Sequence, residues 1–202
     1  MIRVRYLGLA VAAWVLGACS SAPMHYYTLV PPAGEMAGAA APVVGGFQFE
    51  LLPVGVPAQV DQPQLVVRQG GQGVVVLQGD RWIAPLGDEL RSALSADLAR
   101  DFRAQDVSGL PSQGKNTVRI KLDVRRFDSV PGSYAYIDAA WSLRSLKGGD
   151  ALACTSRISE PVGAGYDTLV QGHQQAIARL AGQIGAAASA MVSGQSANCP
   201  SN

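Results

Sequence analysis

One stretch of the chain alternates apolar and polar residues through three successive segments. These are Thr117–Phe127, Ser133–Leu146 and Ala151–Ser159. Successive side chains of a strand point to opposite faces, so this alternation is typical of strands with one buried face and one wet face. The turn-forming residues Val130–Ser133 and Lys147–Asp150 separate the segments. The pattern therefore predicts an antiparallel meander.

Two further stretches carry apolar residues at helical spacing. The first starts at Pro85 and repeats an apolar residue every fourth position, at Leu86, Leu90, Leu94, Leu98 and Phe102. The second runs from Asp167, a candidate N-cap, to about Val192. Each predicts an amphipathic helix with one apolar stripe.

Shorter strands are expected before the first helix. His25–Val30 is rich in β-forming residues, and a second strand runs from Phe47 to about Val54. Gln64–Arg68 and Val74–Leu77 read as a hairpin with a loose turn between them. Together the elements predict a single α+β domain over residues 26–192, an antiparallel-rich mixed sheet with two long helices packed on one face, followed by a tail at 193–202.

The N-terminus reads as a leader that ends at a cysteine. Two arginines precede the apolar run Leu7–Ala18, which is too short to span a bilayer and fits a signal-peptide core. The small residues before Cys19 match the lipobox of bacterial lipoproteins, in which the cysteine receives lipid. We therefore expect a signal peptide at 1–18 and a lipidated tether at 19–25. The alternative is an ordinary secretory leader followed by a chance cysteine.

The expected leader bears on the protein's location and on its net charge. Ser20, directly after Cys19, is typical of lipoproteins sorted to the outer membrane, on its periplasmic face. Without the leader the chain carries 14 basic and 15 acidic residues. A balance this even provides no field for a polyanion, so a dedicated nucleic-acid partner is not expected.

The remaining cysteines, Cys154 and Cys199, suit a disulfide in an oxidising compartment. Such a bridge would staple the C-terminal tail to the body of the domain. The alternative is a buried Cys154 and a free Cys199. Two cysteines and the distant His25 and His173 make no ligand cluster, so neither a metal site nor a cofactor is expected.

No catalytic constellation is visible in the sequence. His173 lies on the apolar stripe of the second helix, where a lone histidine is usually a packed core residue. Asp88 and Glu89 are adjacent, so on a helix they point apart and suit the dipole of its first turn. The chain is therefore not expected to be an enzyme.

Four residues are candidates for a partner interface. Arg81 and Trp82 belong to residue types that anchor interfaces. Trp82 could instead pack under the start of the first helix, with Arg81 bound to carbonyls or an acid. Tyr134 and Tyr136 fall on the face opposite Ile137 and are expected to point outward. They are either part of a protein contact or solvated decoration of the sheet.

The order of these features resembles the PqiC/YmbA-like family of ABC-type transport auxiliary lipoproteins, over roughly residues 19–192. The resemblance is carried by the lipobox and by segments in one order: Tyr26-Tyr27-Thr28-Leu29, Val54-x-Val56-Pro57, Asp61–Arg68, Arg81-Trp82-x-x-Pro85-Leu86, Val124-Arg125-Arg126-Phe127 and a late Ala-rich helix. The Pro31–Gly46 loop and the Cys154/Cys199 pair are not part of that pattern.

The resemblance implies an outer-membrane lipoprotein of an MCE-type intermembrane lipid transport system. Its partners would be a PqiB-like MCE-domain tunnel protein and the associated inner-membrane component. The lipoprotein would dock the tunnel at the outer membrane, support envelope integrity and perform no chemistry. Because MCE tubes are rings, self-association of the lipoprotein is also expected. Two alternatives are a lipid-binding chaperone with its own apolar pocket and, as the third, a periplasmic hydrolase.

Overall fold

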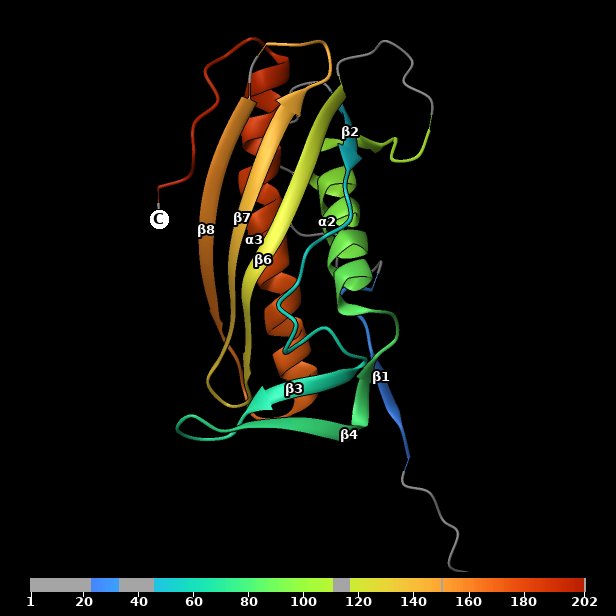
Figure 1. Cartoon of the computed structure of the whole chain (residues 1–202), viewed down its shortest axis with the longest axis vertical. Coiled ribbons are helices and arrows are strands. Elements are labelled where there is room, and N and C mark those ends of the chain that lie inside the picture. The colour runs from blue at the N-terminus through green and yellow to red at the C-terminus, as the bar shows by residue number, and fades with distance from the viewer. Residues whose placement is uncertain (1–22, 33–45, 111–116, 150, 202) are drawn as a thin grey trace, which may run out of the picture.

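The computed structural model describes residues 23–32, 46–110, 117–149 and 151–201. The expected signal peptide, Cys19 and most of the expected tether lie outside these residues. Within them the chain forms one α+β domain with two long helices, as predicted, but its strands build two mixed sheets where the sequence suggested one (Figure 1).

The larger sheet has five strands in the order β5-β2-β6-β7-β8. Its bounds are β2 Gln48–Leu51, β5 Gln105–Asp106, β6 Thr117–Val130, β7 Tyr134–Ser145 and β8 Ala151–Pro161. The last three form the predicted antiparallel meander. Strand β2 lies parallel to both β5 and β6. The apolar positions of the alternation are buried, at Val118, Ile120, Leu122, Val124, Ile137, Ala139, Trp141 and Leu143.

A bulge interrupts β6 between Val124 and Arg126. One extra residue in a strand moves the following side chains to the other face. Phe127 and Ser129 are therefore buried beyond the bulge, whereas the even-numbered residues Val118 to Val124 are buried before it. The bulge decides which polar side chains of β6 meet the helices.

The smaller sheet has three strands in the order β1-β4-β3 and closes one end of the molecule (Figure 1). Its bounds are β1 His25–Tyr27, β3 Gln64–Arg68 and β4 Val74–Trp82. Strands β3 and β4 form the predicted hairpin, and β1 lies parallel to the end of β4. Strand β1 is shorter than the predicted His25–Val30, because the chain turns at Thr28 to meet the first helix.

The helices α2 (Leu86–Phe102) and α3 (Tyr166–Val192) lie on the same face of the five-stranded sheet (Figure 1). Helix α3 packs on β6, β7 and β8, and α2 packs beside it against β5. Their contact is close, because a Cβ at Gly185 would lie 2.3 Å from the Phe102 ring. Asp167 does not cap α3 as predicted. It lies in the first turn, and Gly165, at φ 97°, takes the N-cap position.

Candidate functional site

The segment that follows β1 is fastened to the domain by side chains from both helices. The buried carboxylate of Glu89 on α2 accepts hydrogen bonds from the Leu29 backbone N–H and the Thr28 hydroxyl, both at 2.8 Å. The Gln174 amide on α3 donates to the Thr28 carbonyl at 3.1 Å. The chain that emerges from Cys19 is therefore tied to both helices.

Tyr27 adds a further tie within the small sheet. Its hydroxyl donates to Asp80 on β4 at 3.2 Å, and His25 lies 3.4 Å from the same carboxylate. Burial and the neighbouring negative charge of Asp80 raise the pKa of Tyr27 to about 12. The phenol therefore stays protonated and remains a donor throughout the physiological range.

At its end near Asp128, the face of β6, β7 and β8 that points away from the helices is covered by Arg68 of β3, which pairs with that buried carboxylate. The rest of this face is not covered by any described element (Figure 1). Residues near its middle are small or polar: Ala140, Ser142, Ala153 and Thr155. The C-terminal tail, drawn in red, runs along the outer edge of β8 and forms a raised border. Small side chains beside a raised border leave an open hollow of about 480 Å³.

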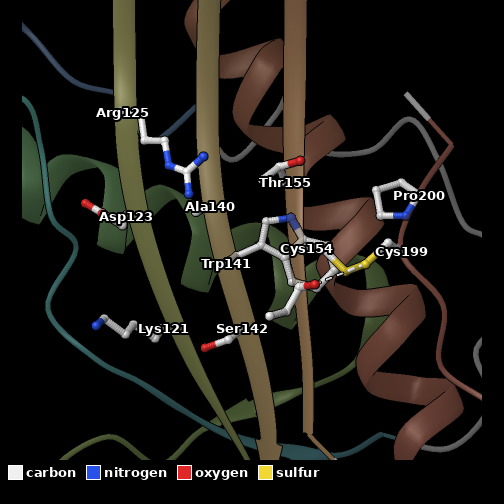
Figure 2. A pocket seen from close by; sticks show the side chains of 11 residues that line it. Lys121, Asp123, Arg125, Ala140, Trp141, Ser142, Cys154, Thr155, Cys199 and Pro200 are labelled. Atoms are coloured by element: carbon white, nitrogen blue, oxygen red, sulfur yellow. Dashed lines mark hydrogen bonds between the residues drawn. A yellow bond between two sulfur atoms is a disulfide. The ribbon is translucent and has the colours of Figure 1, made fainter.

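Figure 2 shows how that hollow is built. Lys121, Asp123 and Arg125 line it from β6, while Cys199 and Pro200 line it from the tail. A disulfide joins Cys199 to Cys154 of β8, with the two Cα atoms 5.4 Å apart. The bridge holds the tail at the edge of the sheet and so fixes one wall of the hollow.

Charges on this outer face are partly neutralised. Arg119 pairs with Glu50 at 2.8 Å, and Arg157 pairs with Asp138 at 3.6 Å. Within the described part of the chain, Lys121 and Arg125 make no ion pair, and both are exposed. The hollow therefore presents two cations with the exposed Asp123 carboxylate between them on β6, and its positive charge exceeds its negative charge by one.

The structure separates the four predicted interface residues. Tyr134 and Tyr136 are half-buried on the outer face of β7, and the Arg126 guanidinium lies 5.2 Å from the centre of the Tyr136 ring. Trp82 is buried, with its ring edge-on to Phe127 at 6.2 Å between centroids. This packing fits the alternative that the sequence left open for Trp82, and the ring is not presented to a partner.

Arg81 of β4 lies beside Tyr26 of β1 in the parallel ladder. Its side chain is on the opposite face of the small sheet from that of Trp82. It is half-buried, and its Nε has no hydrogen-bond partner among the residues of the structure. Arg81 and Tyr134 therefore belong to different sheets, so the candidates form two surfaces: the outer face of the meander and the outer face of the small sheet.

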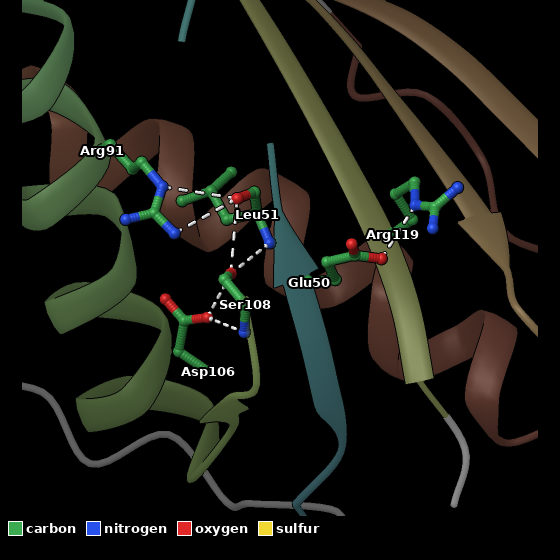
Figure 3. Close-up of polar contacts among 6 residues, drawn as sticks. All are labelled: Glu50, Leu51, Arg91, Asp106, Ser108 and Arg119. Carbon is green, nitrogen blue, oxygen red and sulfur yellow. Dashed lines mark hydrogen bonds and ion pairs between the residues drawn. The ribbon is translucent and has the colours of Figure 1, made fainter. Parts of the chain in front are cut away.

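A polar network next to the sheet edge has a structural role (Figure 3). The Arg91 guanidinium on α2 donates two hydrogen bonds of 3.3 Å to the carbonyl of Leu51, at the end of β2. The Ser108 hydroxyl lies between the Leu51 backbone and the Asp106 carboxylate. These contacts satisfy polar groups where the short strands β2 and β5 end, so they complete the fold rather than open a binding site.

A Ser–His pair, which the sequence analysis missed, lies in the core. The Ser129 hydroxyl and His173 Nε2 are 2.8 Å apart, and the imidazole stacks on Phe127 at 3.9 Å between ring centroids. Burial lowers the pKa of His173 to about 3, so the ring is neutral. Both residues are buried, and no described residue bonds to Nδ1 to orient the ring, as a nucleophilic pair requires. The pair is therefore a packing element, and the bulge in β6 is what turned Ser129 inward.

The described residues hold no group of three or more His, Cys, Asp or Glu side chains placed to bind a metal ion. Neither described helix is both long and apolar enough to cross a bilayer.

Comparison with known proteins agrees with this architecture. The sequence model of a family described as "ABC-type transport auxiliary lipoprotein component" matches residues 27–185. No curated protein matches the sequence.

Two solved structures share the fold. One, of an uncharacterized protein, has a TM-score of 0.64 and 18% identity, and the match covers 82% of this chain and 98% of that one. The other, from Xanthomonas campestris, has a TM-score of 0.63 and 16% identity, with coverages of 81% and 93%. At these identities the likeness establishes the fold alone.

Proposed function

Because this chain belongs to the family of ABC-type transport auxiliary lipoprotein components, we propose that it is the outer-membrane lipoprotein of an MCE-type intermembrane lipid transport system. In this role it docks a PqiB-like, periplasm-spanning tunnel at the outer membrane and helps to maintain the envelope. The inner-membrane component of the system would contact the other end of the tunnel. Family membership supports a role in transport, and the resemblance in the sequence motivates the MCE assignment.

The anchor in this proposal is lipid on Cys19, which follows the apolar run Leu7–Ala18. Several acyl chains hold a protein stably at a membrane, since each buried methylene contributes about 0.8 kcal/mol. Because Glu89 on α2 holds Thr28 and Leu29, lipid on Cys19 would keep the folded domain close to the membrane.

The observation that carries the docking proposal is the uncovered outer face of β6, β7 and β8. It combines the half-buried Tyr134 and Tyr136 with a hollow bordered by Lys121 and Arg125. Tyrosine and arginine side chains are enriched at protein interfaces, and Tyr134, Tyr136 and Arg125 are of these types. We propose that an acidic, surface-exposed segment of the tunnel protein binds here.

A photo-reactive amino acid tests this surface in cells. Placed at Tyr134 or Ser142, it should capture the tunnel-forming protein, while the same probe at Gln175, exposed on α3, should not. Lys121→Glu with Arg125→Glu should reduce capture, and Lys147→Glu in the β7–β8 turn should leave it unchanged. If the correctly located protein captures no tunnel protein from either position, or captures it equally from position 175, the docking surface is wrong.

Self-association is also part of the proposal, and one strand edge supports it. Strand β4 pairs with β1 only through Asp80–Trp82, so among the described residues no strand covers its edge from Val74 to Gly79. Val74, Val75 and Val76 are exposed there. Unpaired edges with apolar side chains are templates for pairing with another chain.

The alternative role, a lipid carrier with its own apolar pocket, finds less support. Three hollows of about 480, 550 and 240 Å³ lie on the outer sheet face, between α3 and the tail, and near the start of β6. Only the smallest of the three is lined by both the sheet and a helix, at the end of α3 beside Val118 and Met191, and at about 240 Å³ it is a small space for an acyl chain. Purified protein without bound lipid would agree with docking, and copurified lipid would favour the carrier.

A further inference from the structure

We propose that the outer face of the small sheet is a membrane-contact surface, on which Met24, Tyr26 and Ile83 meet the lipid interface. The inference rests on the lipid anchor at Cys19 in the proposed function and adds the orientation of the domain on the membrane.

The three side chains are among the most exposed large apolar residues of the structure. Ile83 is 67% exposed, Tyr26 60% and Met24 40%. They come from two segments that lie side by side, because the Ile83 backbone N–H donates to the Tyr27 carbonyl at 2.9 Å. Large apolar side chains gathered at one place on a surface mark an interaction site rather than scattered exposure.

Strand register places these side chains on one face. Tyr26 pairs with Arg81 in the parallel β1–β4 ladder, while the neighbouring pair, Tyr27 and Trp82, points into the core. Met24 directly precedes β1 and Ile83 directly follows β4, and the Ile83 N–H still bonds to the Tyr27 carbonyl. Alternation continued by one residue beyond each strand places Met24 on the side of Tyr26 and Ile83 on the side of Arg81. The small sheet therefore has a core face and an apolar outer face.

The short segment between Cys19 and the described chain keeps this outer face close to the membrane. Four residue steps separate Cys19 from Pro23, where the described chain begins. Whatever its conformation, a segment of four steps reaches at most about 14 Å. Met24 and Tyr26 follow at once, so they are held within a short distance of the lipid headgroups. A face this close to the anchor meets the membrane before it meets any other surface.

The chemistry of the face suits that environment. Tyrosine is enriched at membrane interfaces, because its ring is apolar and its hydroxyl can stay in water. Arg81, across from Tyr26, adds a cation of the kind that lipid phosphates attract. Figure 1 shows that the small sheet lies at one end of the long axis and that the β7–β8 turn lies at the other. The proposed orientation therefore directs that turn into the periplasm.

A lipid-quenching experiment on the full mature chain tests the orientation. Because Cys154 and Cys199 are bonded to each other and Cys19 carries lipid, a cysteine introduced at position 83 or 26 is the free thiol to label with a fluorophore. The matched control is Leu146→Cys, an exposed apolar residue in the β7–β8 turn. The protein is reconstituted in vesicles of phosphatidylethanolamine and phosphatidylglycerol that carry a headgroup nitroxide.

We expect quenching at positions 83 and 26 to be at least about fivefold that at position 146, because interfacial apolar faces lie within roughly 5–10 Å of the headgroup boundary. Failure of the labelled chain to float with the vesicles would overturn the lipid anchor, and the orientation with it. Vesicle-bound protein quenched equally at positions 83 and 146 would overturn the orientation alone. A label at 83 that is shielded from aqueous iodide but not quenched by the nitroxide would place a second copy or another protein there, which also overturns the proposal.

Discussion

The carboxylate of Glu89 accepts a hydrogen bond of 2.8 Å from the backbone N–H of Leu29, across 60 residues of sequence. Both groups are buried, so neither can exchange its partner for water. Through this contact the start of α2 holds the N-terminal strand, and the strand in turn sets where the chain leaves the domain toward its expected anchor.

Glu89→Ala should destabilise the fold, because it leaves the buried Leu29 N–H without an acceptor. An unsatisfied buried donor costs roughly 1–3 kcal/mol, which urea denaturation would measure as a lower midpoint. The neighbouring Asp88→Ala is the control: Asp88 is exposed, and its interaction with the helix dipole is worth less than about 1 kcal/mol. Equal losses in the two variants would mean that the Leu29 contact contributes nothing.

His173 should make stability depend on pH. Burial lowers its pKa from 6.5 to about 3, so between these values the unfolded chain binds a proton that the folded chain excludes. Stability is therefore lost as pH falls below 6.5, by up to about 1.4 kcal/mol per pH unit. Asp97 acts in the opposite direction, since burial raises its pKa to about 6.

Comparing the wild type with His173→Asn isolates the contribution of His173 to the pH dependence of stability, because the contribution of Asp97 is the same in both proteins. The free energy of unfolding of the variant should fall less steeply between pH 6.5 and pH 4 than that of the wild type. The variant is expected to be less stable at pH 7, since it loses the stacking on Phe127. Parallel pH profiles would show that His173 does not titrate on unfolding.

The meander and both helices were predictable from sequence, because apolar residues recur every second position in the strands and every third or fourth position in the helices. The bulge at Val124 and Arg126 was not, since an extra residue leaves the alternation readable on either side of it. Sequence analysis therefore placed His173 correctly in the core but did not find Ser129 as its partner. The division of the strands into two sheets escaped prediction for a similar reason: short strands carry no signal of their neighbours.

Contacts between distant segments account for the rest. Glu89 was interpreted as a dipole residue of a first helical turn, and its burial follows only from the position of Leu29. The hollow beside Lys121 and Arg125 is complete only with the C-terminal tail as one wall. The tail follows α3 in the sequence and is brought back to β8 by the disulfide. By contrast, the outward position of Tyr134 and Tyr136 was predictable, because alternation alone decides it.

Two glycines of α3 should respond to alanine in opposite directions. A Cβ at Gly185 would lie 2.3 Å from the Phe102 ring, whereas nothing lies within 4 Å of a Cβ at Gly182. Gly185→Ala should therefore destabilise the contact between α2 and α3 by about 1–3 kcal/mol, as overpacking does. Gly182→Ala should stabilise the helix by up to about 1 kcal/mol. Thermal unfolding of both variants checks the signs, and a stabilising Gly185→Ala would show that the Phe102 ring moves aside freely.

The bridge between Cys154 and Cys199 should stabilise the domain by constraining its unfolded chain. It closes a loop with a sequence separation of 45, and bridges of this kind contribute about 2–4 kcal/mol. The double variant Cys154→Ser, Cys199→Ser should therefore lower the urea midpoint. Added reductant should lower the wild-type midpoint and leave that of the double variant unchanged.

The same variant tests whether the tail matters for docking. Without the bridge, Cys199 and Pro200 lose their attachment to β8, and the hollow loses one wall. Photo-crosslinking from Ser142, inside the hollow, should fall more than crosslinking from Tyr134, which lies outside the hollow at the start of β7. A matched loss at both positions would trace the effect to reduced stability, and unchanged capture at both would show that the tail takes no part in binding.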